Sequence, residues 1–366
     1  NAGTATAAQI ARARRQADQN FTLAATNFGL AAESFAARAP REISAEKEVP
    51  AEWEWVAKAR CDQADLLLRL GQFKPAATAA STMLGDARLA KSQYHAQAVY
   101  DLGYASFGLK DYASAVRSLS SLAPFDQGEI GVHARFLLGR AHHLAGERPE
   151  AVTDYQAVAA EWEKVLADAR TKLAEQGVSA AEKERLNALL KSPAPDYVAR
   201  AMFYWGVVLS EFGSADDAVA KFIAAVQLAP QSPIAAEARI RAAKSAVEVK
   251  KYHEAADAVT PLIEDAQWGL EALRYLAKAQ YGIGTTPVPK GKGQAAILNA
   301  VADPEALAAA IKQAILTLQK ADDRAKAMPV SGAKMPSSRA MILLDLGDML
   351  QLDRRYADAA VAYANR

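Results

Sequence analysis

The sequence has little cysteine, little net charge and no long hydrophobic run, and each shortage excludes a class of protein. Cys61 is the single cysteine among 366 residues, so an internal disulfide is excluded. Lys and Arg (43) balance Asp and Glu (42), so the clear basic excess of a nucleic-acid-binding protein is missing. No stretch of about 18 apolar residues occurs, and we therefore expect no transmembrane helix in this chain.

Motifs for catalysis and cofactor binding are also missing. Lys290 and Lys292 alternate with glycines, but position 286 is threonine where a phosphate-binding loop needs glycine, and no Ser or Thr follows the lysine. The five histidines lack the spacing of a zinc-binding helix, and no base is identifiable near Cys61. We therefore expect no enzyme activity, no cofactor and no bound metal.

Alanine is abundant and supplies roughly a quarter of the chain. It is the best helix former, because it loses no side-chain entropy in a helix, and its small size lets helices pack closely. Hydrophobic residues make up 51% of the sequence, which is normal for a folded protein. The composition therefore predicts packed helices and no sheets.

One sequence pattern recurs along the chain. A helix with a Leu-Gly or similar small pair is followed about seven residues later by a short turn, then by an aromatic or small residue and an alanine three residues on. In the clearest copy, over residues 201–230, Gly206 lets two helices touch, and Ser214 and Asp217 predict a capping box for the second helix. Other copies contain Ala64, Leu102-Gly103, Leu138-Gly139, Ala242-Ala243, Leu276-Ala277 and Leu346-Gly347.

These copies resemble the W-x2-L-G-x2-Y…A-x3-F…P pattern of the tetratricopeptide repeat (TPR) family, over about four fifths of the chain. The resemblance implies an all-α fold, a right-handed α-α superhelix (TPR-like solenoid) of about seven helix pairs with two insertions. The units look like the degenerate repeats of bacterial envelope proteins, such as lipoproteins that help assemble the outer membrane. This likeness favours a periplasmic or envelope-associated location over a cytoplasmic one, and the compartment stays open.

The pattern divides the chain into four segments. Residues 1–2 look like the remnant of a cleaved tag, and residues 3–50 like a long helix and a loop. Residues 51–195 form a TPR-like block with a helical extension, and residues 196–366 form a second block with a Gly/Pro/Lys-rich insertion near 285–303. Ser179 and Asp303 are expected to cap helices next to the two insertions. Because the chain stops within a helical pattern, we expect it to be a piece of a larger protein.

In TPR-like arrays the first helix of each pair lines the concave side, so the resemblance implies a partner-binding surface there. We looked for first-helix residues that packing between helices does not need. The predicted partner-binding residues are Tyr100, Tyr104, Phe107, His133, Phe136, Arg140, His143, Arg200, Phe203, Arg274, Lys278 and Tyr281.

The aromatic side chains of this set are expected to hold apolar groups of an extended or helical peptide, and Arg140, Arg200 and Arg274 to meet its carboxylates. The alternative for the aromatic residues is ordinary core packing, which is the favoured interpretation for Phe107 and Phe203.

The predicted function is a non-catalytic scaffold that binds a protein or peptide partner on the concave face, and we expect no binding to nucleic acid. Two alternatives stay open. In the first, the chain is a structural subunit that associates with itself through its terminal helices. In the second, it is an accessory array of a larger multidomain protein.

Overall fold

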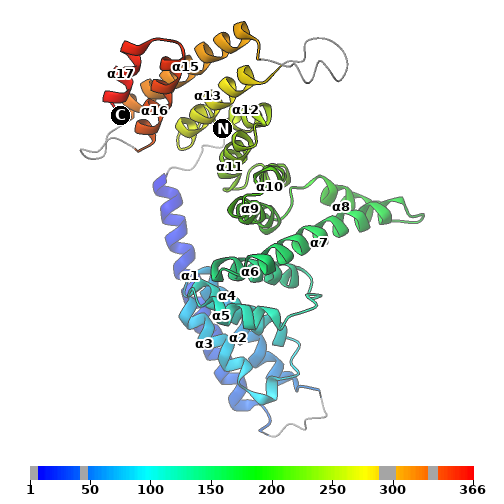
Figure 1. The fold of residues 1–366 in the computed structure, drawn as a ribbon. Coiled ribbons are helices and arrows are strands. Elements are labelled where there is room, and N and C mark those ends of the chain that lie inside the picture. The colour runs from blue at the N-terminus through cyan, green and yellow to red at the C-terminus, as the bar shows by residue number, and fades with distance from the viewer. Residues whose placement is uncertain (1–6, 42–47, 288–301, 329–336) are drawn as a thin grey trace. The chain divides into compact units, whose positions relative to one another are not determined.

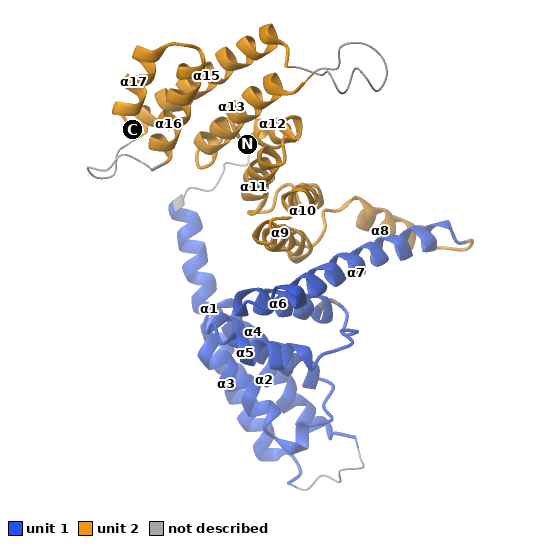
Figure 2. Ribbon diagram, viewed as in Figure 1, with its two compact units in different colours: residues 1–175 blue, residues 176–366 orange. Residues whose placement is uncertain are grey.

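The computed structural model describes residues 7–41, 48–287, 302–328 and 337–366. In these residues all regular structure is helical, which confirms the all-α expectation. The chain divides into two compact units, residues 1–175 and 176–366 (Figure 2). None of the helices described is both long and apolar enough to cross a membrane.

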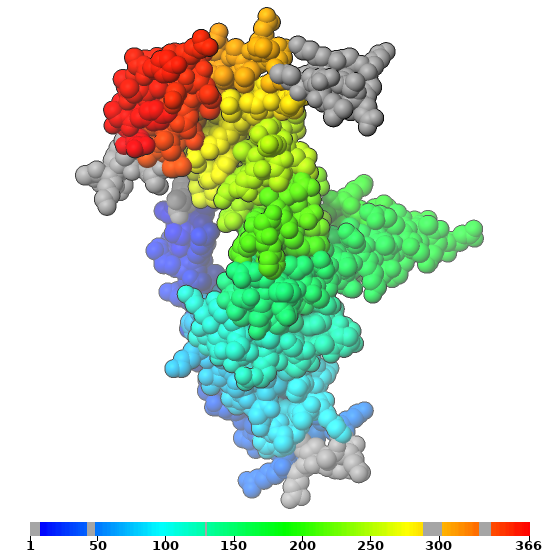
Figure 3. Space-filling view, viewed as in Figure 1, coloured from blue at the N-terminus to red at the C-terminus, as the bar shows by residue number. Residues whose placement is uncertain are grey.

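Unit 1 begins with the long N-terminal helix α1, whose second half packs on α2 through Phe28, Ala32 and Phe35 (Figure 1). Helix pairs then follow one another along the chain, and the second helix of the last pair runs far beyond its partner, so its end projects from the body of unit 1 in Figure 3. The helices are α1 (Ala7–Arg38), α2 (Ala51–Arg69), α3 (Phe73–Leu84), η1 (Ala87–Leu89), α4 (His95–Gly108), α5 (Tyr112–Ser120), α6 (Glu129–Ala145) and α7 (Arg148–Ala174).

Unit 2 opens with a short helix and continues with further helix pairs. The expected insertion falls between α13 and α15, and its residues 288–301 lie outside the described residues. Residues 42–47, in the loop expected after the first helix, and residues 329–336, before α16, lie outside them as well. The helices are α8 (Ala180–Lys191), α9 (Asp196–Glu211), α10 (Ala215–Leu228), α11 (Ala235–Glu248), α12 (Tyr252–Val259), η2 (Thr260–Leu262), α13 (Gly269–Thr285), α15 (Pro304–Ala327), α16 (Ser337–Leu352) and α17 (Tyr356–Ala364).

Six helix pairs of the described chain share one turn between their helices. A residue with positive φ follows the end of the first helix by one or two positions, and the second helix begins two positions after that residue. The residue after the positive-φ position donates its N–H to the carbonyl five positions back, as Asp111 does to Ser106 (3.0 Å), which is a Schellman motif. The positive-φ residues are Gly71, Lys110, Gly146, Gly213, Lys250 and Arg354.

A small residue seven positions before this turn sets the contact within each pair. A Cβ atom on Gly206 would lie 2.8 Å from the ring of Phe222, so only glycine fits against that ring. The same relation joins Gly103 to Leu119. Where the first helix carries alanine instead, as at Ala64 and Ala243, the matching position of the second helix is the smaller Ala80 or Val259.

Two of the expected helix caps are present, and one is wrong. The Ser179 and Asp303 side chains accept hydrogen bonds from the backbone N–H of Glu182 and Glu305. Ser214 stands at the N-cap of α10, but its side chain makes no capping bond. Asp111, at the same position of the same kind of turn, does cap its helix by accepting from the N–H of Ser114 (3.1 Å), so the turn itself permits a cap that the Ser214 side chain does not make.

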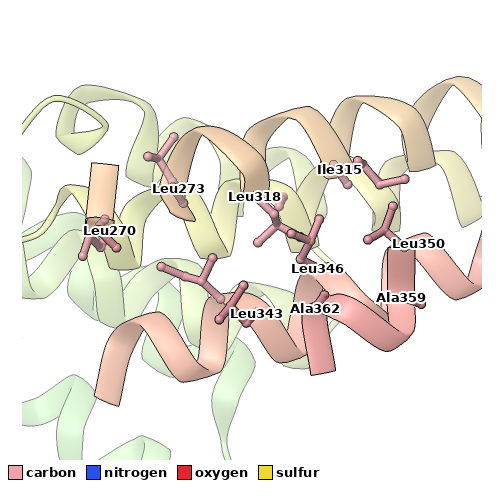
Figure 4. Close-up of a cluster of buried hydrophobic side chains, with 14 of the residues drawn as sticks. Leu270, Leu273, Ile315, Leu318, Leu343, Leu346, Leu350, Ala359 and Ala362 are labelled. Atoms are coloured by element: carbon pink, nitrogen blue, oxygen red, sulfur yellow. The ribbon is translucent and has the colours of Figure 1, made fainter. Parts of the chain in front are cut away.

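The largest core cluster of unit 2 gathers leucine and isoleucine side chains from α13, α15 and α16, closed by alanines of α17 (Figure 4). Leu273 and Leu318 are 2% and 1% exposed. Their burial joins α13 to α15 across the insertion between them. The insertion therefore leaves the packing of these two helices intact.

Candidate binding surface on the first helices

The first helices of neighbouring pairs lie against one another. In unit 1, α2 contacts α4 and α4 contacts α6, while in unit 2, α11 contacts α13 and α13 contacts α16. Within the described ranges, the second helices of neighbouring pairs approach one another less closely. The first helices of each unit thus form a continuous surface, and the side chains that it carries are the candidates for binding.

In unit 1 this surface carries a cluster of rings from α4 and α6, which we call the ring cluster: Tyr100, Tyr104, His133 and Phe136. The Tyr100 hydroxyl lies 2.7 Å from His133 Nδ1, and the ring of Tyr104 is 6.0 Å from the imidazole. The ring of Phe136 packs 5.8 Å from His133 and is only 6% exposed, so it forms the buried floor. The structure thus brings together four of the predicted residues from two helices, with Tyr100 and His133 33 positions apart in the sequence.

The ring cluster is uncharged at neutral pH. Burial lowers the pKa of His133 to about 4 and raises the pKa of Tyr100, so the imidazole is neutral and the phenol keeps its proton. A neutral imidazole and a phenol each carry a donor and an acceptor, and the contact between Tyr100 and His133 uses one of each. The cluster therefore suits apolar and amide groups better than ions.

Asp101 belongs to the same part of α4 and was not among the predicted residues. It is 0% exposed, its Oδ1 accepts a hydrogen bond of 2.8 Å from Gln97, and no described group bonds to its Oδ2. Burial, with a smaller contribution from the nearby carboxylates Asp65 and Asp62, raises the pKa of Asp101 to about 7. The burial of Asp101 could have been predicted from helical spacing, because Asp101 lies between the buried Ala98 and Ala105 on one face of α4.

The remaining predicted residues of unit 1 lie at the edges of the ring cluster. Arg140 Nη1 is 3.2 Å from His143 Nδ1, and the ring of His143 meets that of Tyr155. Phe107 is half-buried against Tyr112 at the start of α5. These contacts lie between the helices of one pair, so Phe107 and His143 contribute first of all to packing.

In unit 2, Arg200 and Phe203 of α9 occupy positions that serve the protein itself. Arg200 donates to the carboxylate of Asp196, one turn earlier on the same helix. Phe203 is 3% exposed and packs against Phe222, with 5.7 Å between ring centroids. This position fits the core interpretation of Phe203, and it is not part of the binding surface that we propose below.

Arg274, Lys278 and Tyr281 of α13 lie near a second feature of unit 2. Arg274 donates to Asp345 of α16, and Lys278 lies 3.4 Å from the same carboxylate. Lys278 and Tyr281 line a pocket of about 280 Å³ between α13 and α16, together with Tyr252 and several apolar side chains. The three predicted residues are therefore close together, but their charge is used inside the chain.

These ion pairs count against one part of the prediction. Arg200 and Arg274 were expected to meet a peptide's carboxylates, and both already bind carboxylates of this chain. A ligand's carboxylate would therefore share each guanidinium with Asp196 or Asp345. Sequence spacing shows the first pair, four residues apart on one helix, but not the second, 71 residues apart.

The arrangement offers little to catalysis or to metal binding. In the described part of the chain, no three His, Cys, Asp or Glu side chains stand close enough together to hold a metal ion. Cys61 is buried in α2, where desolvation raises the pKa of the thiol, so the reactive thiolate is suppressed. No substrate can reach Asp101, because its side chain is fully covered.

Comparison with known proteins gives structural similarities alone. No protein-family model and no curated protein sequence matches the chain. The apo form of RapI is similar over 84% of this chain and 95% of its own, with 11% identity and a TM-score of 0.43. A tetratricopeptide repeat protein from Parabacteroides merdae ATCC 43184 covers 84% of this chain and 91% of its own (11% identity, TM-score 0.42). The apo form of the quorum sensor NprR from B. thuringiensis covers 86% and 75% (12% identity, TM-score 0.39). Similarities of this size say nothing about a ligand or partner.

Proposed function

We propose that this protein is a non-catalytic interaction scaffold, and that the ring cluster on the first helices of unit 1 binds a peptide segment of a protein partner. The observation that carries the proposal is the ring cluster itself. Tyr100, Tyr104 and His133 are half-buried, uncharged and supported from below by Phe136. Rings held this way on rigid helices lose little entropy on binding, which is why aromatic residues dominate binding hot spots.

The chemistry of the ring cluster selects the kind of segment. The tyrosine and imidazole groups present apolar ring faces together with hydrogen-bonding edges and carry no net charge. An apolar side chain of the partner would pack on the rings, and its backbone amides would bond to their polar edges. Arg140, at the edge of the cluster, would add contact to the partner's more polar rim.

A displayed peptide library, selected on the whole protein, tests this proposal. The affinity of the selected peptides is then measured by fluorescence anisotropy for the protein, for Tyr104→Ala and for Arg140→Ala. We expect Tyr104→Ala to weaken binding by about tenfold or more, since loss of a hot-spot ring costs about 2 kcal/mol. Tyr356→Ala is the matched control, because Tyr356 is 64% exposed on a second helix and should not matter.

Two results would contradict the proposal. Peptides that bind Tyr104→Ala as tightly as the unaltered protein would show that the ring cluster is not the site. A fall of more than about 5 °C in the melting temperature of Tyr104→Ala would correspond to about 1–2 kcal/mol and would show that the ring belongs to the core.

Self-association is the second candidate, and exposed apolar residues of α1 favour it. Leu23 and Leu30 are 62% and 59% exposed and lie seven positions apart, so they share one face of the helix. A second α1 could cover this stripe. Light scattering at several concentrations should then show a dimer that Leu23→Glu with Leu30→Glu dissolves, whereas a monomer at every concentration would exclude this role.

A further inference from the structure

Unit 2 has a pocket of about 260 Å³ that belongs to neither surface discussed above. It lies between the second helices α10 and α12, with α11 beneath them, and shares no residue with the pocket beside Lys278. Its apolar lining consists of Ile223, Val226, Ala242 and Ala258, and its polar lining of Gln227, Arg239, Glu254 and Asp257. The separation of the second helices leaves this space open.

Arg239 is the unusual residue of the pocket. It is half-buried on α11, and in the described ranges it makes no ion pair or side-chain hydrogen bond. Arg241, two positions later on the same helix, lies 2.8 Å from Glu237, as surface arginines in this chain commonly do with acidic neighbours. A guanidinium beside apolar groups and without a partner gains more than an exposed one from an incoming carboxylate, because charge-assisted bonds strengthen as water is excluded.

Acidic groups stand on the other wall of the same pocket. Asp257 of α12 lines it and has no ion-pair partner in the parts of the chain that are described, and Glu254, one turn earlier, has only a long contact of 3.8 Å with Lys251. Neither acid lies within 4 Å of Arg239, because no ion pair joins them. The positive charge of Arg239 and the negative charges of Glu254 and Asp257 thus line the same pocket without pairing, together with apolar side chains.

We propose that this pocket binds a free aliphatic α-amino acid as its zwitterion. Its carboxylate would accept paired hydrogen bonds from Arg239, its ammonium group would donate to Asp257 and Glu254, and its side chain would rest on Ile223 and Val226. A simple anion would meet the two acids, and a simple cation would meet Arg239, so each of these ligands is opposed by one wall. The volume of about 260 Å³ accommodates a small molecule of the size of an amino acid.

Titration calorimetry of the whole protein with L-leucine tests this proposal. Leucinamide, which lacks the carboxylate, and N-acetyl-leucine, which lacks the ammonium group, are the ligand controls. Arg239→Gln and Asp257→Asn remove one wall each, and Arg241→Gln is the matched control outside the pocket. We expect leucine to bind, both analogues and both pocket variants to weaken binding about tenfold or more, and Arg241→Gln to leave it unchanged.

Three outcomes would overturn the proposal. No heat of binding with leucine, isoleucine, valine or methionine at concentrations up to about 10 mM would show that the pocket takes no such ligand. Equal binding of N-acetyl-leucine would show a carboxylate site without ammonium recognition. Binding that survives in Arg239→Gln would place the ligand elsewhere. The site is independent of the ring cluster, so loss of peptide binding in Tyr104→Ala leaves this test unaffected.

Discussion

Units 1 and 2 are built from the same kind of helix pair, but they differ in whether a carboxylate buried on a first helix has a positively charged partner. In unit 1, Asp101 is fully buried, accepts one hydrogen bond from Gln97 and has no ion-pair partner among the described residues. In unit 2, Asp345 is shielded by Arg274 and Lys278. The helix pairs depend on turns and small residues that recur, whereas the charge partners come from different helices in each unit. Two units that share a backbone pattern therefore need not share the ion pairs between their side chains.

The difference has consequences for binding. The first-helix surface of unit 1 is uncharged around the ring cluster and responds to pH through Asp101. The corresponding surface of unit 2 is a neutralised ion network beside a pocket. A partner that needs apolar contacts is expected at unit 1, and changes that unbalance charge should matter most in unit 2.

The largest effects on stability should come from changing the glycine contacts that hold helix pairs together in both units. Gly103→Ala would place a Cβ atom 2.6 Å from the Leu119 side chain, and Gly206→Ala 2.8 Å from Phe222. We expect each change to lower the free energy of unfolding by about 2–3 kcal/mol, as other overpacked cores do, measured by chemical denaturation. Phe222→Val should rescue Gly206→Ala, because it copies the smaller contact of Ala243 with Val259. If only one of the two glycine changes lowered the free energy of unfolding, the contact would not have the same role in both units.

The next effect compares a largely buried ion pair with an exposed ion pair, both within unit 2. Asp345→Asn leaves Arg274, whose side chain is 17% exposed, without its carboxylate. We expect a loss of about 2 kcal/mol in the free energy of unfolding, below the range for fully buried pairs because water still reaches Lys278. Glu237→Gln removes the partner of Arg241 in an exposed pair and should cost less than about 0.5 kcal/mol. Equal losses would contradict the distinction.

The pH dependence of unit 1 gives a smaller effect with a defined sign. The pKa of Asp101 is about 7 in the folded chain against 3.8 for an ordinary aspartate, so the folded state holds the proton more tightly than the unfolded state. Asp101 therefore lowers the free energy of unfolding as the pH rises from about 4 to 7, and the loss is complete above pH 7.

Asp101→Asn removes this titration. We expect the variant to gain stability relative to the unaltered protein between pH 5 and pH 8, by on the order of 1–2 kcal/mol, in denaturation series at each pH. Asp168→Asn is a suitable control, because Asp168 is exposed on α7 of the same unit. A pH profile unchanged by Asp101→Asn would show that this carboxylate does not titrate in the folded protein.

The smallest effect tests the turn that both units share. Lys110 in unit 1 and Lys250 in unit 2 have φ of 63° and 62°, a region that costs an L-residue about 1–2 kcal/mol. Lys110→Gly and Lys250→Gly should each stabilise the protein by about 0.5 kcal/mol, because the unfolded chain gains freedom with glycine and offsets part of the benefit. Thermal unfolding of the two variants checks this, and a loss of stability in either would mean that the lysine side chain contributes contacts there.

Much of the fold was predictable because its signals are local. The small residue, the turn seven positions later and the alanine of the second helix recur at fixed spacing, and each acts within one helix pair. The turns at Lys110 and Arg354 were found from the aromatic residue that follows, although neither carries glycine. The capping bond of Ser214 was predicted wrongly, because a suitable residue type at the N-cap does not ensure the bond: Asp111 caps its helix from the same position of the turn, and Ser214 does not.

The candidate site was predictable only where side chains act with neighbours on one helix or on the next. Tyr100 and Tyr104 share a helical face, so their proximity follows from spacing. The contact of Tyr100 with His133 depends on how α4 packs on α6, and the burial of Phe203 depends on Phe222 of α10. Whether these side chains bind a partner stays a prediction.

The sequence by itself determined the helices, the turn positions and the pairing of each first helix with its second, because hydrogen bonds and small-residue contacts at short spacing specify them. Only the tertiary structure decided which charged groups are neutralised, which rings are buried and where pockets open. Arg274 meets Asp345 across 71 residues, whereas Arg239 pairs with no carboxylate in the described ranges although Asp257 lines the same pocket. Such outcomes depend on distances of a few ångströms between separate helices, and the free energy of an ion or a ring changes steeply over that range.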